Sequence, residues 1–267
     1  MINGETERVK RFKSLIGYEE ALKGLDPNKG VVCDWPDPSS WEGLKGSLWK
    51  IYGETLRAER AVVIRRWFLR QGDQTLLIEI VVSSAGPNVP TEHLLKIASS
   101  STLPEIPFAK GPKDLGQLAI QFGNGEPKIL IWTFYNVCFR IQQMEQKINI
   151  LPLARWIQNL AEKHLAVRLA DHLPKVNSVN ISAKQIRVGE TVTIKVHPIH
   201  GQDPDRLLLE VGAVNDALDL TMKEGFSVGL NGKKPGQGEL EIIVADKKNL
   251  LCSPLLVRVE IVESDKK

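Results

Sequence analysis

The chain has 267 residues, of which 42% are hydrophobic and 25% charged, with a formal net charge of +3. This balance is typical of a globular protein that buries a real core. No apolar run approaches the roughly 18 residues that a membrane helix needs, and the small positive excess is too dispersed to indicate a nucleic-acid surface.

The first two thirds of the chain read as a helix followed by runs of strands. Apolar residues from Thr6 to Leu22 recur at helical spacing. The segments after them are rich in β-branched and aromatic residues, and Gln71-Gly72-Asp73 is typical of a hairpin turn. We expect strands at 48–52, 60–69, 75–82, 115–122, 128–134 and 137–142, a short helix over 91–99 with Thr91 as its N-cap, and a closing helix from Pro152 to about Asp171.

This order predicts an α+β domain, an antiparallel sheet with helices packed on one face, because the strands come in runs and do not alternate with helices. Leu173-Pro174-Lys175 marks a change in composition, so we expect one domain over 1–174 and another over 175–267. In the second, short strands at about ten-residue intervals predict an all-β sandwich. They fall at 179–181, 191–197, 207–211, 226–230, 238–245 and 254–262.

Two segments of the second domain carry a family resemblance. The run 186–196, IRVGETVTIKV, is similar to the start of the second strand in bacterial immunoglobulin-like modules, and 235–246, PGQGELEIIVAD, looks like their late strands. The resemblance implies an immunoglobulin-like domain over 175–262, a spacer or interaction module commonly attached to extracytoplasmic bacterial proteins. The segment departs from antibody domains, since it has no core Trp and no Cys pair, and Phe226 is its only aromatic residue.

For residues 1–174 the resemblance is one of element order alone. Helix, strands, short helix, strands and closing helix resemble the small α+β folds of the cystatin-like or PsbP-like kind. Those folds mostly bind and rarely catalyse, and an analogy of fold carries little functional weight.

Metal-binding and redox motifs are scarce. His197 and His200 could hold a metal only with a third ligand such as Asp203 or Asp205, and a polar strand exit explains the same residues. The three cysteines, Cys33, Cys138 and Cys252, lie over a hundred residues apart and form neither a disulfide framework nor a zinc site. We therefore expect no cofactor and no bound metal.

Catalytic motifs are equally scarce. Asp73 and Glu79 flank a strand in a way that resembles the acidic pair of metal-dependent nucleases, but Val81 stands where such an enzyme has its lysine. No serine lies in a nucleophile elbow, and no glycine-rich segment has the spacing of a phosphate-binding loop. An enzyme is disfavoured, with a hydrolytic site assembled from scattered residues of the first domain as the alternative.

The placement of tryptophan is the most informative feature. All six lie in the first domain, and Trp35 and Trp41 lie in a loop rich in Pro, Ser and Asp where nothing requires a large ring. Exposed indoles beside Asp34 and Asp37 suit the binding of a sugar or peptide by stacking and hydrogen bonds. The alternative is that the loop folds over an open side of the sheet and uses its indoles as plugs.

These observations favour a non-enzymatic binding or interaction protein with an unidentified protein or glycan ligand. In this interpretation the α+β domain recognises the ligand and the sandwich is a spacer or docking module; the alternative is that the sandwich itself binds through an exposed sheet edge. No nucleic acid and no integral membrane segment is expected. The family resemblance implies an extracytoplasmic or secreted protein, whereas the absence of a signal-peptide core in the first twenty residues leaves a cytoplasmic location open.

Overall fold

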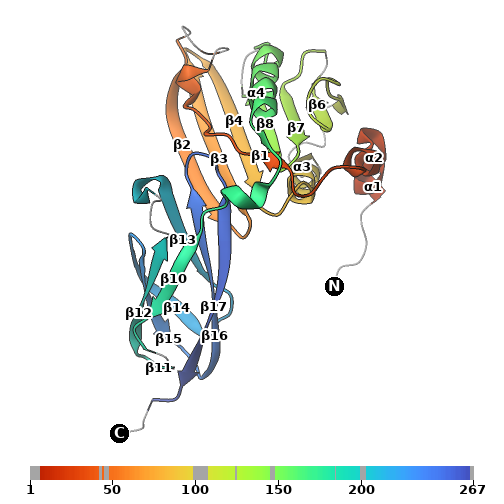
Figure 1. Cartoon of the computed structure of the whole chain (residues 1–267). Helices are drawn as coiled ribbons and strands as arrows, with labels where there is room; N and C mark the ends of the chain where they lie inside the picture. Colours follow the sequence, from red (N-terminus) through yellow and green to blue (C-terminus); the bar gives the residue numbers. More distant parts are fainter. Residues whose placement is uncertain are drawn as a thin grey trace. The chain divides into compact units, whose positions relative to one another are not determined.

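The computed structural model describes residues 7–41, 44, 48–98, 108–123, 125–144, 148–183, 185–198 and 203–264. The fold is predominantly β, with 49% of the described residues in strands and 20% in helices. The chain divides into two compact units: Met1–Arg57, Val62–His172 and Lys248–Leu250 form the first, and Ala58–Ala61, Leu173–Lys247 and Leu251–Lys267 form the second. Figure 1 labels their elements.

The first unit is built on a seven-stranded sheet with the order β2-β3-β4-β8-β7-β6-β5, and the strand pairs from β3 to β5 are antiparallel. These strands are β2 (Lys50–Glu59), β3 (Val62–Gln71), β4 (Gln74–Ser83), β5 (Phe108–Lys110), β6 (Leu118–Phe122), β7 (Ile129–Phe134) and β8 (Val137–Gln143). Two short strands, β1 (Gly30–Val31) and β9 (Leu165–Ala166), pair separately. The helices are α1 (Glu7–Ile16), α2 (Tyr18–Leu22), α3 (Asn88–Ala98) and α4 (Leu151–Lys163), with 3-10 turns η1 (Pro38–Ser40) and η2 (Leu169–His172).

The hairpin of β3 and β4 shows how the sequence specifies this sheet. Gln71 pairs with Gln74 across the predicted turn, where Gly72 has a φ of 56° that a side chain would disfavour. From Leu76 onward every residue of β4 is buried, because this strand lies inside the sheet and both of its faces are covered. A continuous apolar run is typical of such a strand.

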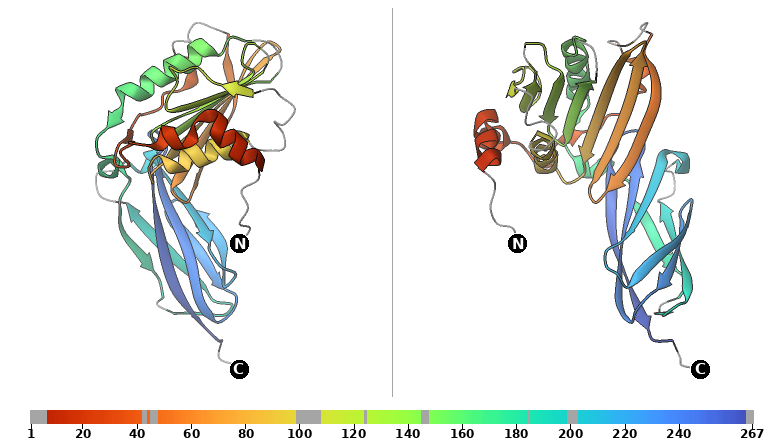
Figure 2. Two further views of the ribbon diagram at one scale, coloured as in Figure 1. Left: turned by 90° about the vertical axis from the view of Figure 1, so that its right-hand side faces the viewer. Right: turned by 180° about the vertical axis from the view of Figure 1, so that it is seen from behind.

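Helices cover both faces of the sheet, so the prediction that they pack on one face is wrong. Alternate strand residues point to opposite faces. On one face, Phe12 of α1 and Leu94 of α3 share a core with Ile131 of β7, and Figure 2 shows α1 beside α3. On the other face, Trp132 donates its indole N–H to Gln158 of α4 at 3.0 Å.

The first helix and the closing helix of this unit both end earlier than predicted. The first helix breaks at Gly17, whose φ of 72° is left-handed, so α1 and α2 are separate. The closing helix ends at Lys163, because Leu165 and Ala166 pair with β1 as strand β9. Thr91 is not an N-cap: α3 begins at Asn88, and the Thr91 hydroxyl donates to the Pro87 carbonyl at 2.9 Å.

The second unit contains two four-stranded sheets, with the orders β10-β12-β15-β14 and β11-β17-β16-β13. Their strands are β10 (Val176–Ile181), β11 (Gln185–Arg187), β12 (Thr191–Pro198), β13 (Leu207–Ala213), β14 (Leu218–Glu224), β15 (Ser227–Gly232), β16 (Gly236–Asp246) and β17 (Cys252–Val262), with a 3-10 turn η3 (Pro204–Arg206). Ile194 of one sheet and Ile242 of the other belong to the same buried core. The unit is therefore a β-sandwich, with β11 and β17 paired in parallel.

Candidate functional site

The loop with the predicted ligand-binding indoles is folded into the core of the first unit. Trp35 is 3% exposed and Trp41 is 0% exposed. The Trp41 ring stacks on Trp156 at 5.4 Å between centroids and meets Trp67 edge-on at 5.6 Å. Its indole N–H donates to the Pro36 carbonyl at 3.0 Å. Neither Trp35 nor Trp41 offers an open ring face for a ligand, so the plug alternative explains their positions.

The two aspartates of this loop are exposed, and one has a clear structural task. Asp37 is the N-cap of η1: its carboxylate accepts from the Ser39 backbone N–H at 2.9 Å and from the Ser39 hydroxyl at 2.6 Å. Asp34 follows Cys33, and burial together with the Asp34 charge raises the pKa of the Cys33 thiol to about 12. Cys33 is therefore a protonated core residue at neutral pH, and no reactive thiolate is available there.

A row of charged side chains crosses the sheet beneath α3. Glu79 of β4 lies opposite Arg66 of β3 on one side and opposite Arg140 of β8 on the other. The Glu79 side chain is 1% exposed, and its Oε2 accepts from Arg66 Nε. Arg140 donates to the neutral amide oxygen of Gln142. One buried carboxylate thus lies between two guanidinium groups.

His93 of α3 completes this ion cluster, but at a longer distance. Its Nε2 is 3.7 Å from Glu79 Oε1, beyond hydrogen-bond reach, so the direct donor to this carboxylate is Arg66. Burial alone would raise the pKa of Glu79, yet the interactions with His93 and Arg66 outweigh it and hold the pKa at about 2. A carboxylate this acidic and this buried is a poor general base or acid near neutral pH.

Glu79 stands out in the sequence, but the cluster around it does not. The available signal was a single carboxylate within the otherwise apolar run Leu76–Val82, where a strand buried on both faces cannot leave a charge unpaired. That signal identifies Glu79 but not its partners, because His93 comes from a helix that only the fold brings over β4.

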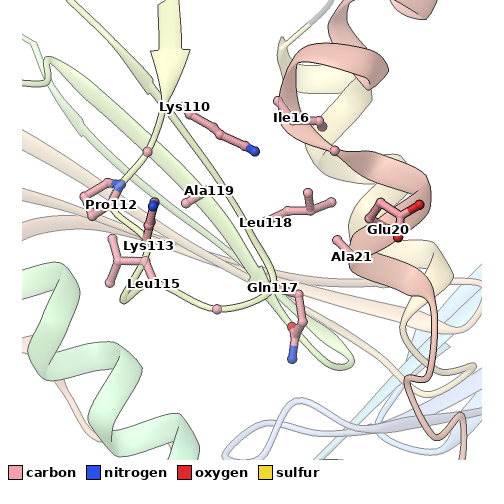
Figure 3. A pocket seen from close by; sticks show the side chains of 13 residues that line it. Ile16, Glu20, Ala21, Lys110, Pro112, Lys113, Leu115, Gln117, Leu118 and Ala119 are labelled. Carbon is pink, nitrogen blue, oxygen red and sulfur yellow. The ribbon is translucent and has the colours of Figure 1, made fainter.

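A cleft of about 450 Å³ opens between the α1–α2 corner and the β5–β6 segment. One wall comes from residues 16–21 and the other from residues 110–119, as Figure 3 shows. From the strand wall, the Leu118 side chain points toward the α1–α2 corner, and the Lys110 side chain reaches toward Ile16. The volume falls within the roughly 300–1,000 Å³ of small-molecule sites.

Glycines shape both walls of this cleft. Gly17 makes the left-handed corner between α1 and α2, and Gly116 has a φ of 55° where the loop crosses the end of β7. A Cβ on Gly116 would lie 2.0 Å from the Thr133 carbonyl oxygen, which instead accepts from the Gln117 backbone N–H at 2.9 Å. The close approach of loop and strand therefore requires glycine here.

We expect Gly116→Ala to lower the free energy of unfolding by about 2–4 kcal/mol, since it combines left-handed strain with a backbone collision. Gly125→Ala is the matched control: its φ is 83°, but nothing lies within 4 Å of the added Cβ, so only about 1–2 kcal/mol of strain is expected. Urea unfolding of both variants gives the comparison. Equal losses would show that the loop does not contact β7 as described.

Hydrogen-bond donors dominate the polar groups of the cleft. Lys110 and Lys113 line it and have no carboxylate within ion-pair distance among the described residues. The one lining carboxylate, Glu20, is engaged by Lys23 at 2.7 Å on the exposed side of α2. Gln117 uses its Oε1 to accept from the Tyr135 backbone N–H at 2.8 Å. The cleft is thus chemically suited to an acceptor-rich ligand.

The part of the chain that the structure describes contains no candidate metal-binding site. No group of three or more His, Cys, Asp or Glu side chains there could hold an ion. His197 Nε2 lies 3.3 Å from the Asn180 side-chain nitrogen, and His200 lies outside the described residues. None of the helices seen in this structure is both long enough and apolar enough to cross a bilayer.

Comparisons with known proteins add little to this geometry. No protein-family model matches the chain, and no curated protein matches it. Among solved structures, the chain is similar to the extracellular domain of a proposed one-component system from B. thetaiotaomicron, with 8% identity over 80% of this chain and 31% of that one. The TM-score of that match is 0.22, so the likeness carries no argument about fold or function.

Proposed function

We propose that this protein is a non-enzymatic binding protein whose first unit recognises its ligand in the cleft between the α1–α2 corner and the β5–β6 segment. The cleft itself carries the proposal: a concavity of about 450 Å³ with a floor of apolar and small side chains and unpaired donors on one wall. This combination of an apolar floor and a few polar groups is typical of ligand sites. No histidine, cysteine or serine lies among the described lining residues, and no group of metal ligands does.

In this proposal the second unit is a spacer or docking module of immunoglobulin type. Its strand orders support this, since β10-β12-β15-β14 corresponds to the strands A-B-E-D and β17-β16-β13 to G-F-C of an immunoglobulin sandwich. Strand β11 adds a parallel edge to the second sheet. The sequence resemblance implies a bacterial, extracytoplasmic protein whose recognition unit is exposed. This location is part of the same proposal.

The hydrolytic alternative receives less support from the geometry. It requires a carboxylate and a histidine that converge on a substrate, and Glu79 with His93 is such a pair. However, Glu79 is 1% exposed and is already engaged by Arg66, so a substrate cannot reach it in this conformation. The ion cluster fits a structural role better, joining β3, β4 and β8 beneath α3.

The test fills the cleft. Ala21 lines it from α2 and also packs against the core that contains Phe12 and Leu94, so Ala21→Phe fills the cleft and its Tm without ligand is compared with that of the wild type first. The control Asn159→Phe adds the same ring on the exposed face of α4. Thermal unfolding of the full chain is measured with panels of small acids, peptides and glycans.

We expect at least one panel member to raise the Tm of the wild type and of Asn159→Phe, and to leave Ala21→Phe unchanged, because only a ligand bound to the native state raises its stability. A panel without effect on the wild type, or a ligand that stabilises Ala21→Phe as well, would refute the cleft as the recognition site.

A further inference from the structure

The polar groups of the cleft define the charge of its ligand. Lys110 and Lys113 bring two ammonium groups to one wall, and neither has an acidic partner among the described residues. Lys110 Nζ lies 3.7 Å from the position of a Cβ on Gly17, so it is placed at the C-terminal end of α1. The opposite wall offers one carboxylate, which Lys23 already engages. A ligand with a negative group complements this arrangement, and a cationic one does not.

The small residues of the cleft define the shape of its ligand. Gly17, Ala21, Gly111 and Ala119 all line it, and within one wall Gly111 packs directly on Ala119, because a Cβ on Gly111 would lie 2.7 Å from the Ala119 Cβ. Beneath them Ile16, Leu115 and Leu118 are buried and form the apolar layer on which the cleft rests. The lining is therefore made of small and apolar residues, and among those described it holds no aromatic side chain on which a flat ring or a sugar could stack.

Together these features specify one ligand class. Resting on the proposed function of the cleft, we infer that its ligand is a small carboxylic acid: a slender alkyl chain lies between Ala21 and Ala119, and its terminal carboxylate accepts from Lys110 and Lys113. The alkyl chain provides affinity through burial of apolar surface, and the two ammonium groups select the charge. Neutral sugars lack the carboxylate, and a folded partner protein is too large for a site of about 450 Å³.

The experiment compares three probes of equal chain length: octanoate, octanol and octylamine. They are titrated into the full-length protein at neutral pH, and backbone amide resonances are followed by two-dimensional NMR. Gly17, Gly111 and Gly116 report on the cleft, since all three line it. The test variant is Lys110→Gln/Lys113→Gln, and the control is Lys128→Gln/Lys163→Gln, which removes two exposed lysines that do not line the cleft.

We expect octanoate to shift the three glycine resonances and to bind at least about tenfold more tightly than octylamine. In Lys110→Gln/Lys113→Gln the affinity for octanoate falls to that for octanol, while the control variant binds as the wild type does. If octanol or octylamine binds at these glycines as tightly as octanoate does, the inference about a carboxylic acid is wrong. The cleft then remains a ligand site. If none of the three probes shifts these resonances, both the inference and the cleft's assignment as the recognition site are wrong.

Discussion

Trp41→Ala is expected to lower the free energy of unfolding of the first unit by about 3–5 kcal/mol, the range for loss of a large buried aromatic side chain. The Trp41 ring is fully buried and contacts both Trp67 and Trp156, so its removal leaves a cavity between β3 and α4. The indole also supplies the hydrogen bond to Pro36, which the alanine cannot replace. Urea unfolding followed by far-UV circular dichroism measures the loss without relying on tryptophan emission.

The control for Trp41→Ala is Leu48→Ala. Leu48 is 77% exposed, and its truncation should change stability by no more than about 0.5 kcal/mol. The competing interpretation makes the opposite prediction: if Trp41 is a recognition residue, the alanine variant keeps its stability and loses a ligand. That result would show that Trp35 and Trp41 form a ligand-binding loop. It would also show that Trp41 is not packed between Trp67 and Trp156 in solution.

The sequence predicted the regular elements where a local pattern determines them. The hairpin turn at Gly72 and the strands on either side of it follow from β-branched and aromatic composition and turn chemistry alone. Six strands of the sandwich follow from their spacing, whereas β11 and β14 are not predicted. Strand β2 was predicted as 48–52 but runs over Lys50–Glu59. Its second half is largely polar because it is an edge strand, and an edge strand does not need a continuous apolar face.

Long-range contacts explain what the sequence could not predict. Trp41 reads as a loop residue because nothing near it in the sequence shows that Trp67 and Trp156 form its pocket. The cleft joins segments that lie about ninety residues apart, and its glycines read individually as turn residues. Composition identifies a residue type that needs an explanation, whereas burial and partners depend on the tertiary fold. Most strands and the sandwich were therefore accessible from the sequence, and the candidate site was not.

Glu79→Gln is expected to destabilise the protein by about 3–5 kcal/mol at pH 7, because it leaves the guanidinium group of Arg66 without its buried counter-ion. The matched control is Glu54→Gln, which removes the partner of Arg65 on the neighbouring strand pair. The Glu54 side chain is 38% exposed and lies 2.6 Å from Arg65 Nε, so this ion pair is screened by solvent and should contribute less than about 1 kcal/mol. A similar loss in both variants would show that Glu79 is not buried as described.

The pH dependence of this difference identifies the carboxylate directly. The pKa of Glu79 is about 2 in the folded protein, below its ordinary value of 4.5, so the unfolded chain binds the proton first as the pH falls. The stability that Glu79 contributes is therefore complete above about pH 4.5 and is lost as the pH falls through about 2. Denaturation curves at pH 7, 4 and 2.5 should show wild type and Glu79→Gln converging in stability by about 2–3 kcal/mol. Failure to converge would mean that Glu79 titrates normally and that Arg66 and His93 do not hold its charge.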